Sequence, residues 1–196
     1  MQRTMFTTPV VRTVFRAVSV LFLKLAGWRW ESEIPAGVTK SVLIAAPHTS
    51  NWDVVYMLTV AFALRTELFW LGKRQLFRFP FGGVMKWMGA IPVNRDKSTN
   101  LVTASVAALK SAQGTVHLAL SPEGTRKRID QWKTGFYYIA VGAGVPIVLG
   151  YLDYGRKVGG FGPLFHPTGD LAADLPAIKA FYAPIKGKNA DQFITA

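Results

Sequence analysis

Short apolar runs alternate with longer segments of mixed polarity along most of the chain. Four of these runs are typical of buried β-strands, at residues 42–46, 67–71, 116–119 and 146–151. Helices are predicted at residues 54–64, 100–113, from 134 onward, and 174–186. Residues 156–169 are rich in Gly and Pro and predict a hairpin or loop. This alternation predicts an α/β fold: a single domain with a mixed, mainly parallel sheet flanked by helices.

Residues 5–30 form an amphipathic segment ahead of this domain. Arg12, Arg16 and Ser19 occupy one helical face, and the apolar face holds Val11, Val14, Phe15, Val18, Leu21, Phe22 and Leu25. The uncharged run between Arg16 and Lys24 has seven residues, whereas about 20 are needed to span a bilayer. Trp28 and Trp30 follow, and such side chains favour a bilayer interface. We therefore expect residues 1–30 to be a membrane-interface segment and residues 31–196 to be the globular domain.

The hydrophobic segments also have other interpretations. The first helix could be an ordinary amphipathic helix packed on its own domain. A cleaved signal peptide is disfavoured because the apolar stretch is short and no small-residue cleavage site follows it. Residues 134–152 also lack charge, but Gly142, Gly144 and Pro146 interrupt them, so a buried helix, a turn and a strand are expected there.

The composition limits the classes of partner. The 196 residues include 23 Lys and Arg against 11 Asp and Glu, a net charge of +12 that favours anionic partners such as a lipid surface. Half the residues are hydrophobic and no nucleic-acid-binding signature appears, so nucleic acid is not expected as a partner. The chain has no Cys, which excludes thiolate catalysis, and its three His show no metal-ligand spacing.

A histidine and an aspartate follow the first predicted strand at residues 42–46. His48 precedes Asp53 by five residues, and the intervening turn can fold the two side chains together. An imidazole held by a carboxylate is a general base, because the carboxylate fixes the tautomer and leaves the other ring nitrogen free. The alternative is that Asp53 merely caps the helix that starts there.

A second polar turn, residues 121–126, follows the predicted strand at 116–119. Pro122 and Gly124 are typical of a tight turn, and Arg126 provides a planar guanidinium suited to a phosphate. Taken alone, this turn is better interpreted as an exposed loop with a surface ion pair.

Together these segments resemble the glycerolipid acyltransferase family. That family has an H-x4-D block, a block ending in Arg, a P-E-G-T-R block and an apolar block containing Pro. The chain shows them in order, at residues 48–53, 89–95, 122–126 and 145–148. Lys73 and Gly82 look like the lead-in to the second block, and the resemblance covers roughly residues 40–155. Pro47 stands where the phospholipid-making members usually carry Asn, and Ser121 where they often carry Phe, which leaves the acceptor open.

The resemblance implies an O-acyltransferase whose catalytic part is residues 31–196. The acyl donor would be acyl-CoA or acyl carrier protein, with no further cofactor, and the acceptor would be a lysophospholipid, most simply 1-acylglycerol-3-phosphate. His48 would be the general base and Asp53 its partner, and the substrates would be bound by Lys73, Arg95, Glu123, Gly124, Thr125 and Arg126. The enzyme would work at the cytoplasmic face of an anionic membrane as a peripheral or monotopic protein.

Other functions stay open at this point. The same pair could activate water in an acyl-thioester hydrolase, the acceptor could lack phosphate, or the chain could be a non-catalytic lipid-binding protein. A Ser50 acyl-enzyme is disfavoured because no G-x-S-x-G motif surrounds that serine. His117 is expected to pack or to hydrogen-bond within its strand. Residues 77–88, an apolar segment broken by Gly and Pro, are expected to be mostly core, with a part that lines an acyl groove or enters lipid.

Overall fold

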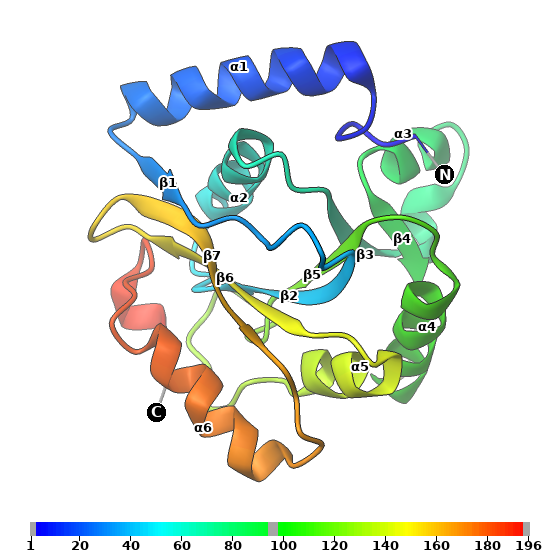
Figure 1. Ribbon diagram of the computed structural model, residues 1–196, viewed down its shortest axis with the longest axis vertical. Coiled ribbons are helices and arrows are strands. Elements are labelled where there is room, and N and C mark those ends of the chain that lie inside the picture. The colour runs from blue at the N-terminus through cyan, green and yellow to red at the C-terminus, as the bar shows by residue number, and fades with distance from the viewer. Residues whose placement is uncertain (1–2, 94–97, 194–196) are drawn as a thin grey trace.

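A mixed sheet runs through the middle of the computed structural model. The structure describes residues 3–93 and 98–193, apart from the side chains of Lys73 and residues 98–100. The strand order is β1-β7-β6-β2-β5-β3-β4 (Figure 1). The strands are β1 (Arg29–Glu31), β2 (Lys40–Ala46), β3 (Leu68–Lys73), β4 (Ala90–Val93), β5 (Val116–Leu120), β6 (Ile147–Asp153) and β7 (Val158–Phe165). Strands β6, β2, β5, β3 and β4 are mutually parallel, while β7 is antiparallel to β6. The predicted α/β fold with a mainly parallel sheet is confirmed.

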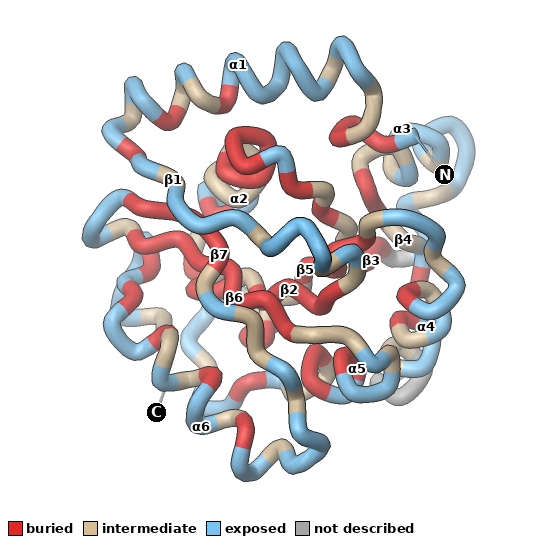
Figure 2. Tube along the Cα trace, viewed as in Figure 1, coloured by how far each residue is buried: buried red, intermediate tan, exposed pale blue. Residues whose placement is uncertain are grey.

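Helices cover both faces of the sheet. They are α1 (Pro9–Leu25), α2 (Trp52–Ala63), α3 (Gly82–Trp87), α4 (Ser98–Ser111), α5 (Gly135–Ala143) and α6 (Leu171–Tyr182), with short 3-10 turns η1 (Arg74–Phe77) and η2 (Ala190–Gln192). Figure 1 shows α1 and α2 on one side and α5 and α6 on the other. Successive side chains of a strand point to opposite faces. Leu43 of β2 therefore joins the core under α1 and α2, and Val42 and Ile44 join the core that contains α5 and α6. Figure 2 shows the resulting pattern of buried strands and exposed outer helix surfaces.

The predicted elements agree with the structure in kind and differ at their ends. The helix expected from residue 54 begins at Trp52. The closing helix begins at Leu171, because the Asp170 side chain caps it by accepting hydrogen bonds from the N–H groups of Ala172 and Ala173. It ends at Tyr182. Residues 158–165 form the second strand of the predicted hairpin. The edge strand β1, which pairs with β7, was not predicted, because three residues are too few to show a pattern.

The N-terminal helix α1 has two apolar sides. Its inner side packs on α2, with Leu23 fully buried and Phe15 and Phe22 in ring contact with Phe62 and Tyr56. Its outer side exposes large apolar side chains, namely Val10, Val14, Val18, Leu21 and Leu25. The apolar positions that the sequence places on one face are thus divided between domain packing and solvent. Within the described part of the chain, no helix combines the length and apolar character needed to cross a bilayer.

Candidate active site

The predicted histidine–aspartate pair lies at the carboxyl end of β2. In the parallel register, Ile44 of β2 is paired with Leu120 of β5, and Ala46 with Tyr151 of β6. The turns that follow these three strands therefore meet at one edge of the sheet, which is where sites form in such folds. This common edge brings together side chains from distant parts of the sequence.

Asp53 is held in place by the start of α2. The carboxylate is buried, and its Oδ2 accepts hydrogen bonds from the N–H groups of Thr49 and Ser50, both at 2.7 Å. Because Asp53 lies in the first turn of α2, the helix dipole also favours its negative charge. The aspartate therefore closes the turn of residues 49–53 from inside the helix. It does not cap α2, whose N-cap is Asn51, so the alternative that Asp53 merely caps the helix is wrong.

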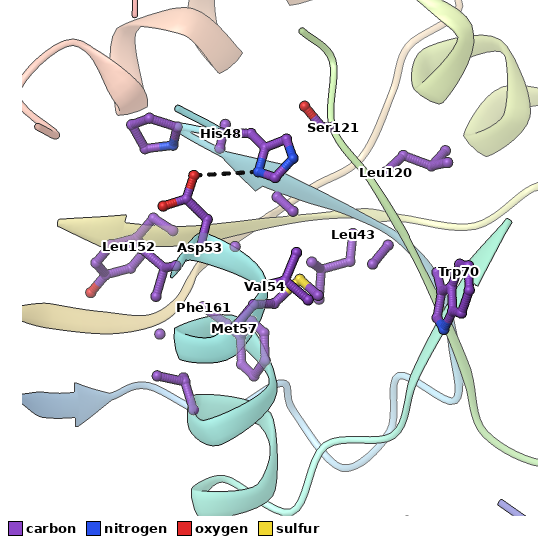
Figure 3. A pocket seen from close by; sticks show the side chains of 18 residues that line it. Leu43, His48, Asp53, Val54, Met57, Trp70, Leu120, Ser121, Leu152 and Phe161 are labelled. Carbon is purple, nitrogen blue, oxygen red and sulfur yellow. Dashed lines mark ion pairs between the residues drawn. The ribbon is translucent and has the colours of Figure 1, made fainter. Parts of the chain in front are cut away.

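The same carboxylate reaches the histidine. Nδ1 of His48 lies 3.3 Å from Oδ2 of Asp53 (Figure 3). The His48 side chain is 26% exposed, and among the described residues its Nε2 has no hydrogen-bond partner. The predicted proximity of the two side chains is confirmed. An imidazole oriented through Nδ1 with Nε2 accessible has the geometry of a general base.

A third residue, Tyr154, completes the environment of Asp53. Its hydroxyl donates to Oδ1 of Asp53 at 2.8 Å. Burial acts to raise the pKa of Asp53, but hydrogen bonds from the four donors around it outweigh this and hold the pKa below its ordinary value. Tyr154 also packs edge-on against Trp28 and Tyr56, with ring centroids 4.9 and 5.6 Å away. An aromatic cluster thus connects the segment after α1 to the pair.

Glu123 lies beside the pair and holds its backbone. Both carboxylate oxygens accept the N–H of His48, at 3.0 and 2.9 Å, and the side chain is buried. Burial raises the pKa of Glu123 to about 7, because one backbone donor compensates little of the lost hydration and Asp53 adds a like charge. The sequence predicted that Glu123 binds substrate. In the structure its contacts are with the histidine loop.

The other predicted binding residues are placed differently. Gly124 has a φ of 64°, and a side chain there would meet Lys133, so this position requires glycine for the turn. Thr125 accepts the N–H of Lys127, and the Arg126 side chain is exposed. Arg95 and the side chain of Lys73 lie outside the described residues. None of the residues from Glu123 to Arg126 lines the cavity described next.

An apolar cavity of about 170 Å³ begins at the pair. Figure 3 shows His48 and Asp53 on one side of it, Met57 and Phe161 below them and Trp70 at the far side. Its other walls are Leu43, Ala45, Ala46, Pro47, Val54, Val60, Ala119, Leu120, Ser121, Gly150, Tyr151, Leu152 and Gly160. The buried Ser121 hydroxyl oxygen has no hydrogen-bond partner among the described residues. The cavity suits an alkyl chain whose polar end lies at His48. Among the described residues, no cluster of His, Asp and Glu could hold a metal ion.

The C-terminal segment closes the histidine loop. The backbone N–H of Asn189 donates to the Thr49 hydroxyl at 3.2 Å, and its side-chain amide donates to the Thr49 carbonyl at 2.8 Å. Lys188 lies over the rings of Trp52 and Tyr154, with Nζ 5.1 and 6.0 Å from their centroids. Tyr154, Lys188 and Asn189 were not predicted from the sequence, because nothing in their local pattern connects them with residues 48–53. His117, in contrast, is buried as predicted, but its hydrogen bond, at 2.8 Å, is to the Ser41 hydroxyl of the neighbouring strand β2 and not within its own strand.

Comparison with known proteins agrees with the resemblance. The family model described as Acyltransferase matches residues 28–149. The 1-acyl-sn-glycerol-3-phosphate acyltransferase of Haemophilus influenzae is 30% identical over 132 residues, 63% of this chain and 53% of the relative. That of Salmonella typhimurium is 31% identical over 133 residues, 63% and 52%. The chain therefore spans about half the length of these curated relatives. The crystal structure of the 1-acyl-sn-glycerophosphate acyltransferase from Thermotoga maritima has the same fold, with a TM-score of 0.56 at 15% identity, covering 88% of this chain and 80% of that one.

Proposed function

Because this chain belongs to the glycerolipid acyltransferase family, we propose that it transfers a fatty acyl group from a thioester to the free hydroxyl of 1-acylglycerol-3-phosphate. The observation that carries this proposal is the His48–Asp53 pair at the side of an apolar cavity. The relatives' names support the acceptor. The donor is acyl-CoA or acyl carrier protein, and no other cofactor takes part.

The transfer begins with His48 as general base. Nε2 takes the proton of the acceptor hydroxyl while the hydroxyl oxygen attacks the thioester carbonyl carbon. The tetrahedral intermediate then expels the thiolate, which receives the proton from the imidazolium. The products are an ester and a free thiol, so atoms and charge balance. General-base catalysis of this kind contributes about 10²–10⁴-fold.

Asp53 and Glu123 support this step from behind the imidazole. Asp53 accepts a hydrogen bond from the Nδ1–H of His48, which fixes the tautomer with Nε2 as the acceptor nitrogen, and it stabilises the imidazolium that forms. Glu123 fixes the main chain at His48. We thus assign Glu123 a positioning role in place of direct acceptor binding.

The apolar cavity is proposed to receive the acyl chain. Most of its lining side chains are apolar, so they would exclude water from an alkyl chain that enters beside His48. The phosphate of the acceptor is assigned to Arg126 and, from the family resemblance alone, to Lys73 and Arg95. A guanidinium can bind two phosphate oxygens at once.

The chain is proposed to meet its lipid substrates at an anionic membrane, as a peripheral protein on the cytoplasmic face. The apolar outer side of α1, which includes Val14, Val18 and Leu21, is exposed and is expected to enter the interface. Replacing these three residues by Ser should weaken binding to vesicles while α1 keeps its inner contacts with α2.

One assay distinguishes acyl transfer from the remaining alternatives. Purified protein is incubated with long-chain acyl-CoA or acyl carrier protein and a set of lysolipids with and without phosphate, and free thiol and acylated lipid are followed. Thiol release that depends on 1-acylglycerol-3-phosphate is the expected result. Release without acceptor would identify a thioester hydrolase, and equal use of an acceptor without phosphate would overturn the assigned acceptor.

A further inference from the structure

The segment between β3 and β4 exposes an unusual number of apolar side chains. Phe79 is 98% exposed and Phe81 65% exposed, and Leu76 and Val84 beside them are 45% and 51% exposed. Single exposed apolar residues are ordinary, but several within one short segment mark a contact surface. The expectation that residues 77–88 are mostly core is wrong, because none of them is buried. We call residues 74–86 the basic-aromatic turn, because basic side chains accompany the aromatic ones.

The basic side chains line a groove in the same turn. Arg74, Arg78 and Lys86 surround a hollow of about 630 Å³, and none of the described residues that line it is acidic. The sequence of residues 68–94 contains no Asp or Glu at all. Such a groove attracts anions, and its charge is not neutralised by neighbouring carboxylates.

The position of the turn relates it to the proposed active site. It follows the carboxyl end of β3, which is parallel to β5 and β2, so it belongs to the sheet edge that carries His48. Helix α3, which begins within the turn, is also joined to the N-terminal segment through its last residue. Trp87 Nε1 donates to the Thr8 hydroxyl at 3.2 Å, and the Met5 N–H donates to the Trp87 carbonyl at 2.8 Å. Figure 1 shows α3 close to the N-terminal end of the chain. The turn is therefore fixed relative to the start of α1.

We propose that the basic-aromatic turn is a lipid-binding element that inserts Phe79 and Phe81 into an anionic bilayer and binds lipid phosphates with Arg74, Arg78 and Lys86. An anionic bilayer has an apolar interior below negatively charged headgroups. The exposed aromatic side chains of the turn suit the apolar interior, and the basic side chains beside them suit the headgroups. This inference rests on the proposed function, in which the acceptor is a bilayer lipid. It adds a second membrane contact, distinct from α1, at the catalytic edge of the sheet.

The test is vesicle flotation of the full chain with phosphatidylcholine vesicles and with phosphatidylcholine–phosphatidylglycerol vesicles. The double variant Phe79→Ser/Phe81→Ser should lower the partition coefficient at least about tenfold on both vesicles, since two large apolar contacts are lost. Arg74→Gln/Arg78→Gln should lower it by about ten- to thirtyfold on the anionic vesicles and little on the neutral ones. The matched control is Tyr138→Ser/Val141→Ser, which removes two exposed apolar side chains of α5, and should float as wild type.

A second measurement separates this inference from the proposed function. Acyl transfer to a short-chain, water-soluble 1-acylglycerol-3-phosphate should proceed in the turn variants at the wild-type rate, because no membrane is needed. Turn variants that float like wild type would overturn the proposal. If Arg74→Gln/Arg78→Gln also raised KM for the soluble acceptor while flotation stayed unchanged, the groove would be assigned to binding the acceptor. The wild-type chain could also show no acyl transfer while its turn variants lose flotation. That result would support the lipid-binding turn and overturn only the proposed function.

Discussion

The two turns that build the candidate site, residues 47–53 and 121–126, differ in what surrounds their carboxyl groups. The first turn is closed, in the sense that Thr49 and Asp53 are buried and accept hydrogen bonds from Asn189 and Tyr154, respectively. The second is half closed, since Pro122 and Glu123 are buried while Gly124 and Arg126 face solvent. The first turn thus holds the His48–Asp53 pair that is proposed to be catalytic. The second turn supports that pair through the buried Glu123 and exposes the Arg126 guanidinium to solvent.

The two buried carboxyl groups show that burial alone does not decide charge. Asp53 has donors at both oxygens and its pKa is lowered, so it stays ionised at neutral pH. Glu123 shares a single N–H between its oxygens, and burial raises its pKa to about 7. The number of donors, which only the fold provides, separates a permanent negative charge from one that titrates near neutral pH.

The largest expected effect comes from the closed turn. His48→Ala should lower kcat by about 10²–10⁴-fold, because the proposed general base is lost. Asp53→Asn should also lower kcat, because the amide favours the wrong tautomer of His48. The double variant should be little worse than His48→Ala, since both residues serve one step. Steady-state kinetics with circular dichroism as a folding control measures this. A folded His48→Ala protein with near-normal transfer would rule the mechanism out.

The next effect concerns the charge of the half-closed turn. Glu123→Gln keeps an acceptor for the His48 N–H but has no charge, so kcat should fall about tenfold at pH 8, where the wild-type carboxylate is ionised, as expected for one charge-assisted contact. At pH 6 the loss should be smaller, because Glu123 with a pKa of about 7 is then mostly protonated. A ratio of the two rates that does not change with pH would contradict the titration of Glu123.

The same substitution predicts a change in stability with pH. The pKa of Glu123 is raised from an ordinary 4.5 to about 7, so its contribution to stability is complete below pH 4.5 and is lost as the pH rises to about 7. In Glu123→Gln this contribution to the pH dependence of Tm should disappear. Thermal melts of both proteins at several pH values between 4.5 and 8 measure it, with Glu123→Ala as the variant that also loses the hydrogen bond to His48.

A smaller effect is expected at the exposed end of the second turn. Arg126→Lys replaces a planar fork by a point charge, so KM for 1-acylglycerol-3-phosphate should rise about fivefold while KM for the acyl donor changes little. Equal KM values for both proteins would show that Arg126 does not bind the phosphate.

The smallest effect tests the support of Asp53 from outside the two turns. Tyr154→Phe removes one donor, and the others remain, so kcat should fall about threefold with an unchanged KM. Tyr137→Phe is the matched control, since it also removes a phenol–carboxylate hydrogen bond, to Asp174 at 2.7 Å, far from the pair. Both variants should lower Tm, and a loss of kcat in both would mean that Tyr154 acts only through stability.

Much of the fold could be predicted from the sequence because the strands are short apolar runs and Gly, Pro and polar residues separate them from the longer helical segments. The pair at His48 and Asp53 could be predicted for a similar reason, since one short turn contains both residues. The roles of Glu123 and Tyr154 could not. Each contacts the pair through the meeting of parallel strand ends, 75 and 101 residues away in sequence, and local spacing carries no information about such contacts.

The division of the apolar residues shows the same limit. The sequence alone determined that residues 5–30 are amphipathic and residues 77–88 apolar, because these properties depend on side-chain types and helical spacing. Which of these side chains are buried depended on the tertiary structure. Phe22 lies against Tyr56, whereas Leu25 and Phe79 face solvent. Burial is decided by what the rest of the chain brings alongside, and that is set by the packing of distant elements.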